Sequence, residues 1–88
     1  MPVYLISYDI AEKDAFEYEP LWEKLKEMRA TRILYSEWVV KGDSATDLYA
    51  ELSPLIQPKD RLLVQGITRE ASWDRLMISD DAFRAFFR

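Results

Sequence analysis

Hydrophobic and polar positions follow strand-like spacing in some parts of the chain and helix-like spacing in others. The first run, Val3–Ile10, is rich in β-branched and aromatic residues and is largely apolar on both faces, which predicts a central strand covered on both sides. After a charged stretch, apolar residues recur at helical spacing. Pro20 suits a first helical position, and acids precede bases, so we predict a helix over Glu19–Arg29.

The middle of the chain returns to strand composition and then to a helical pattern. Ile33–Lys41 reads as a strand. Ser44, with Asp47 three residues later, is a capping signature for a second helix over Ser44–Ile56. A further apolar run predicts a strand over Arg61–Ile67.

Two strand arrangements agree with this order of elements. A ferredoxin-like fold has two strands between its helices, and a bend would supply them as Ile33–Tyr35 and Glu37–Val40; otherwise the tail contributes a strand. Ala71–Ile78 fits either a short strand or a helical turn, and Ser79–Asp81 starts a terminal helix with a phenylalanine stripe. We predict a single α+β domain over all 88 residues. It is a ferredoxin-like sandwich, an antiparallel sheet with two helices on one face and a short C-terminal helix.

Composition narrows the chemistry that this chain can perform. It has no Cys and no His, which excludes thiol and imidazole nucleophile systems and nearly all zinc sites. A formal net charge of −4 disfavours non-specific nucleic-acid binding, but is compatible with a local basic patch. The first apolar run ends at Asp9, too short for a signal peptide or membrane span, so we expect a cytoplasmic protein. Three Trp, five Tyr and four Phe exceed the needs of one small core and favour a subunit interface.

Three segments resemble the small CRISPR-associated Cas-two family. Tyr4–Ile10 resembles its first strand with a Tyr-Asp pair, Arg32–Val39 its Ser followed two residues later by an aromatic, and Lys59–Val64 its Asp opening a later strand. The nearest likeness is to bacterial members of the superfamily called SinR-like, which share the long loop after Asp9 and the Ser-x-Trp pair.

This resemblance implies a ferredoxin-like homodimer. In the family, the aspartate that ends the first strand approaches its two-fold mate and can hold a divalent metal. In this sequence that residue is Asp9, which makes it the candidate catalytic and metal-binding residue, with magnesium as the ion. Some members are endonucleases and others are scaffolds in spacer integration. The resemblance therefore implies either a metal-dependent nuclease or a non-catalytic dimeric module that binds a protein or nucleic-acid partner.

Other side chains are weaker candidates for the same site. Ser36, predicted in mid-strand, is a candidate catalytic group touching a phosphate or water near Asp9, or else a core hydroxyl. Tyr8 and Trp38 are candidates for stacking on bases, or else core or dimer contacts. Four basic residues are candidate phosphate contacts, or else solvated surface: Arg32, Lys41, Arg61 and Arg69.

Overall fold

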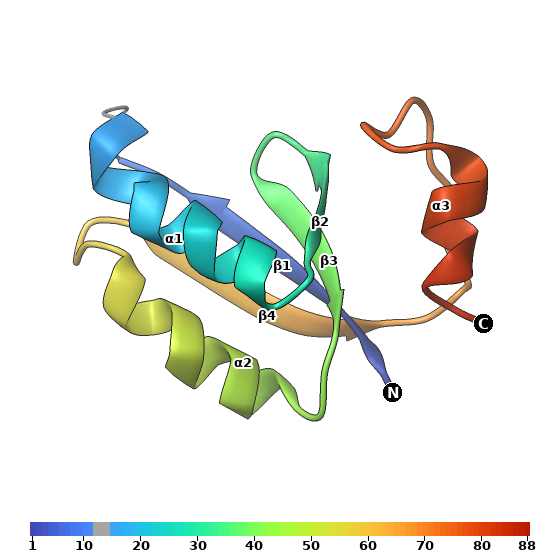
Figure 1. Cartoon of the computed structure of the whole chain (residues 1–88), viewed down its shortest axis with the longest axis horizontal. Coiled ribbons are helices and arrows are strands. Elements are labelled where there is room, and N and C mark those ends of the chain that lie inside the picture. Colours follow the sequence, from blue (N-terminus) through green and yellow to red (C-terminus); the bar gives the residue numbers. More distant parts are fainter. Residues whose placement is uncertain (12–14) are drawn as a thin grey trace.

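One four-stranded antiparallel sheet organises the chain, for which a computed structural model describes residues 1–11 and 15–88. The sheet order is β2-β3-β1-β4. The strands are β1 (Val3–Asp9), β2 (Thr31–Leu34), β3 (Glu37–Lys41) and β4 (Arg61–Ile67). The helices are α1 (Ala15–Glu27), α2 (Ala45–Leu52), the short 3-10 helix η1 (Ser53–Leu55) and α3 (Asp80–Ala85). Figure 1 shows α1 and α2 close together, with α3 set apart from both.

The element order confirms the predicted α+β class with an antiparallel sheet, packed helices and a short C-terminal helix. The second strand pair comes from a bend inside the middle run, not from the tail, so a continuous strand over Ile33–Lys41 is wrong. Tyr35 and Ser36 form the turn. The Arg32 guanidinium donates two hydrogen bonds to the Tyr35 carbonyl, at 3.0 and 2.5 Å, and so stabilises this turn.

Helix α1 begins at Ala15, four residues before the predicted start at Glu19. Pro20 therefore lies inside the helix, where its missing N–H removes one intrahelical hydrogen bond. Tyr18 in the added turn is only 2% exposed, so burial of its ring offsets that loss.

The helix also ends earlier than predicted, at Glu27 instead of Arg29. Arg29 adopts a left-handed φ of 63°, and the Ala30 N–H donates to the Leu25 carbonyl at 2.9 Å. This is the hydrogen bond of a Schellman-type helix end, formed here without the usual glycine.

Helix α2 begins as predicted and ends sooner. The Ser44 hydroxyl caps it by accepting a hydrogen bond from the Asp47 N–H at 3.0 Å. The predicted helix over Ser44–Ile56 stops at Leu52 and continues as η1, which contains Pro54. Pro54 has no N–H to donate to the carbonyl four residues earlier, so the α-helical hydrogen-bond ladder ends there.

Two hydrophobic clusters lie on the two faces of the sheet. The cluster beneath α1 and α2 is formed by Tyr4, Ile6, Tyr8, Leu21, Leu25, Trp38, Val40, Leu48 and Leu52. The cluster beneath α3 is centred on Ile33, Val39 and Phe83. β1 is therefore covered on both sides near Val3, while Asp9 at its other end is exposed.

The segment between β4 and α3 forms neither of the elements considered for Ala71–Ile78. It crosses its own sheet, and the Met77 N–H donates to the Ile33 carbonyl at 2.9 Å. The Ser79 hydroxyl then caps α3 through the Ala82 N–H at 3.1 Å, and Phe83 docks the helix. Within the described ranges, no helix is long and apolar enough to span a bilayer.

Candidate functional site

Asp9 lies at the exposed end of β1, directly opposite Arg61 at the start of β4. Its Oδ2 is 3.6 Å from the Arg61 Nη1, and the two side chains are 75% and 85% exposed. Ser7 and Leu63 line the same shallow hollow, whose volume is about 240 Å³. The sheet register therefore creates a carboxylate–guanidinium pair that both water and a ligand can reach.

Ser36 lies near this pair through its backbone only. Its carbonyl accepts a hydrogen bond from the Tyr8 N–H at 3.1 Å, which places it across from the residue before Asp9. The residue is exposed in the β2–β3 turn, so both its predicted mid-strand position and the alternative of a core hydroxyl are wrong. Ser36 is not among the residues that line the hollow.

Tyr8 and Trp38 belong to the core, with exposed fractions of 4% and 5%. The Tyr8 hydroxyl accepts hydrogen bonds from the indole N–H groups of Trp22 and Trp38, each at 3.1 Å. Base stacking requires an open ring face. The placement of both rings therefore agrees with the alternative of core contacts and not with base stacking.

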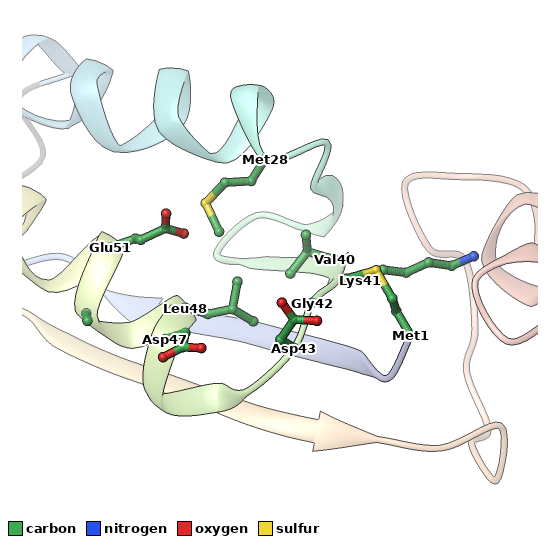
Figure 2. A pocket seen from close by; sticks show the side chains of 10 residues that line it. Met1, Met28, Val40, Lys41, Gly42, Asp43, Asp47, Leu48 and Glu51 are labelled. Atoms are coloured by element: carbon green, nitrogen blue, oxygen red, sulfur yellow. The ribbon is translucent and has the colours of Figure 1, made fainter.

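Arg32 and Lys41 are not gathered around Asp9. The Arg32 guanidinium holds the Tyr35 carbonyl and lies 5.8 and 6.0 Å from the ring centroids of Tyr35 and Trp38. Lys41, at the end of β3, borders a different hollow, and Figure 2 shows its ammonium group pointing away from the carboxylates there.

That second hollow has a volume of about 540 Å³ and lies between the ends of α1, β3 and α2. The carboxylates of Asp43, Asp47 and Glu51 surround it, together with the apolar side chains of Met28 and Leu48 (Figure 2). A surface with this charge repels phosphate, so Lys41 is poorly placed as a phosphate contact.

Asp60 lies one residue before Arg61 and accepts three hydrogen bonds. Its carboxylate accepts from the backbone N–H groups of Ala11 and Gln57, at 2.9 and 2.8 Å, and from the Tyr18 hydroxyl at 3.1 Å. Burial raises the pKa of Asp60, but these hydrogen bonds outweigh it and hold the pKa below its ordinary value. Asp60 thus joins the end of β1, the start of α1 and the start of β4, and supports the site without lining it.

In the described part of one chain, Asp9 is the one carboxylate that lines the hollow. Across residues 1–11 and 15–88, no group of three or more His, Cys, Asp or Glu side chains is placed to hold a metal. Magnesium is usually held by one or two carboxylates, with water and substrate phosphates completing its shell. The Asp9 carboxylate is paired with Arg61, and Asp9 of a second copy is one source of another.

Fold and site together define a ferredoxin-like α+β protein with an exposed Asp9–Arg61 salt bridge at the end of its first strand. No protein-family model matches the chain.

Sequence patterns alone did not pair Asp9 with Arg61, because residues 52 positions apart meet only through the strand register. The family resemblance did single out Asp60, as the Asp that opens a later strand, but did not indicate its three hydrogen-bond donors. An acid that directly precedes a strand and follows a proline-containing loop is a useful signal for such a cap.

Proposed function

We propose that this chain forms a cytoplasmic Cas-two-like homodimer that cleaves phosphodiester bonds of nucleic acid, with Asp9 of each copy holding a shared magnesium ion. The observation that supports the proposal is the exposed Asp9–Arg61 pair over the hollow at the end of the central strand. An isologous two-fold interface at this end would bring two such carboxylates together.

The two side chains would have separate roles. When bound, the ion would supply a hydroxide nucleophile or stabilise the leaving oxygen. Arg61 would bind the substrate phosphate, since a guanidinium matches phosphate oxygens in geometry and charge. A phosphate on Arg61 would replace Asp9 as its partner and free the carboxylate. Because both groups are exposed, this exchange does not leave an unpaired charge in a buried position.

A non-catalytic dimeric module is the second candidate, and different observations favour it. At the hollow, the described part of each chain offers one carboxylate that is already paired with a guanidinium. Apolar side chains are exposed toward this end of the sheet: Leu34 (39%), Tyr35 (81%) and Leu63 (51%). Such side chains suit a contact surface for a second copy or another partner.

The deciding experiment measures cleavage of single- and double-stranded RNA and DNA with magnesium or manganese. It compares the wild type with Asp9→Asn and with Asp74→Asn as the matched control. Asp74 is also exposed and also lies 3.6 Å from an arginine, in a segment that does not border the hollow. We expect Asp9→Asn to lower the rate at least about 100-fold, since even second-shell partners of a metal are worth 10–100-fold. Asp74→Asn should leave it unchanged.

Absence of cleavage by the wild type, or equal cleavage by the wild type and Asp9→Asn, would eliminate the nuclease. If the protein is nonetheless dimeric, the interaction module remains.

A further inference from the structure

A separate cavity lies between the chain that leaves β4 and helix α3. Its volume is about 430 Å³, within the range of small-molecule sites. Three arginines and three aromatic side chains line it: Arg69, Arg84, Arg88, Trp73, Phe83 and Phe87. It shares no lining residue with the hollow at Asp9.

The cavity is locally positive in a chain whose net charge is −4. Of the described residues that line it, none is acidic. Arg84 lies 3.9 Å from Asp81, outside the cavity, whereas Arg69 and Arg88 have no salt-bridge partner within the described chain. Asp80, which does not line the cavity, accepts a hydrogen bond from the indole N–H of the lining residue Trp73 at 2.9 Å. Two guanidinium groups are therefore available for an anion.

The aromatic wall is held in fixed geometry. The Trp73 and Phe83 rings meet edge to face at 4.7 Å between centroids, and Phe83 and Phe87 meet likewise at 5.5 Å. Phe83 is buried, so it anchors the other two rings to the sheet. The Arg84 guanidinium lies 5.4 Å from the Trp73 ring centroid. Aromatic rings and arginine planes are the surfaces on which nucleobases stack.

We propose that this cavity binds one nucleotide. Its base lies against the side chains of Trp73, Arg84 and Phe87, and its phosphate binds Arg69 and Arg88. The charge alone would also suit a carboxylate, but the aromatic rings beside the arginines favour a ligand that also carries a flat aromatic group. The nucleotide is either free or the terminal unit of a single strand. The cavity adjoins the Ile67 end of β4, and Arg61 lies at the other end of that strand. The two ends are roughly 20 Å apart, given the rise per residue of a β-strand. One nucleotide cannot occupy both sites.

The test uses the full chain labelled with 5-fluorotryptophan, without metal, so that cleavage plays no part. Trp22, Trp38 and Trp73 give three fluorine NMR signals, and Trp73→Phe identifies the third. Adenosine and uridine monophosphates and short single-stranded oligonucleotides are titrated in. We expect a saturable shift of the Trp73 signal with the two core tryptophans unmoved.

Arginine variants locate the phosphate. Arg69→Gln and Arg88→Gln should each weaken binding at least about tenfold, the worth of one charge-assisted hydrogen bond. Arg75→Gln is the matched control, because it makes the same charge change in the same segment without lining the cavity. Unmoved Trp22 and Trp38 signals in each variant show that the fold is intact.

The oligonucleotides distinguish the two sources of the nucleotide. Equal affinity for the monophosphate and the oligonucleotide identifies a free nucleotide, and tighter binding of the oligonucleotide identifies a strand end. The proposal is overturned by no saturable Trp73 shift, by an equal shift with inorganic phosphate alone, by a shift with acidic peptides only, or by arginine variants that bind like the wild type. Asp9→Asn should bind normally, so failure here is separate from failure of the nuclease proposal.

Discussion

Tyr8 combines two roles on the helix-covered face of β1. Its ring fills the core, and its hydroxyl is the acceptor for two indole N–H groups. An indole N–H can only donate, so a buried tryptophan depends on an acceptor at the right place. Trp38 is 5% exposed and Trp22 is half-buried, so water is not a full substitute for this hydroxyl.

Replacing Tyr8 by Phe tests this dependence. We expect Tyr8→Phe to lower the free energy of unfolding by about 2–3 kcal/mol, since it leaves two donors without their acceptor. Tyr4→Phe is the control on the same strand and face, where the hydroxyl makes one longer bond of 3.3 Å to a backbone carbonyl. It should cost about 0.5–1 kcal/mol. Urea denaturation measures both values, and equal losses would contradict the two-indole account.

Asp60 shows a different residue-scale effect, because its charge matters. The three donors around its carboxylate favour the ionised form and hold its pKa below the ordinary value of 3.8. A carboxyl group with a lowered folded-state pKa stabilises the fold above the unfolded-state pKa, and that contribution is lost as the pH falls through the folded-state pKa.

We therefore expect Asp60→Asn to be destabilised by about 1–2 kcal/mol at neutral pH, since an amide cannot accept all three hydrogen bonds. The difference from the wild type should be constant above about pH 5 and shrink as the pH falls below 3.8. Thermal unfolding followed at pH 7, 5, 4 and 3 measures it. A difference that grows toward low pH would show that the hydrogen bonds do not favour the charged form.

At the scale of elements, the C-terminal segment is a second layer that only partly covers its face of the sheet. α3 has six residues and would be marginal as an isolated helix. Its stability comes from the Ser79 cap and from Phe83, which packs against Ile33 and Val39. Phe83 is the one buried side chain of this segment, so its docking contributes strongly to holding the segment on the sheet.

We expect Phe83→Ala to cost about 3–5 kcal/mol, typical of a buried phenylalanine. Much of that cost should appear as local release of the segment after β4, seen as faster limited proteolysis between residues 68 and 79. Phe86→Ala, at a half-buried ring on the same helix, should cost about 1–2 kcal/mol. Slow proteolysis of Phe83→Ala would mean that other contacts hold the segment.

At the scale of the whole molecule, the end of the sheet near Asp9 is left open by α3. Leu63 is exposed beside Asp9 and Arg61, and lines the same hollow. If two copies bring their Asp9 residues together at this hollow, we expect Leu63 to lie in the interface.

We expect Leu63→Lys to weaken the proposed dimer at least about tenfold, because it would place an unpaired charge in the contact. Tyr49→Lys is the matched control, with an apolar side chain 49% exposed on α2, compared with 51% for Leu63. Sedimentation equilibrium measures the dissociation constant of each. A monomeric wild type, or a Leu63→Lys dimer of normal strength, would contradict pairing of the Asp9 residues.

The sequence alone determined the class of the fold and most of its elements, since period-two and helical spacing, the Ser44 and Ser79 caps and the apolar β1 run are local signals. It did not determine the bend at Tyr35–Ser36, because no glycine marks a turn there. It also did not determine the extra first turn of α1, because no helix-start signal marks Ala15.

Only the tertiary structure decided which side chains meet. Strand register pairs Asp9 with Arg61 and buries Tyr8 and Trp38, and docking of α3 gathers Arg69 with Trp73 and Phe87. Most of these groupings depend on how separate elements pack together, and their energies depend on burial and geometry that no local pattern encodes.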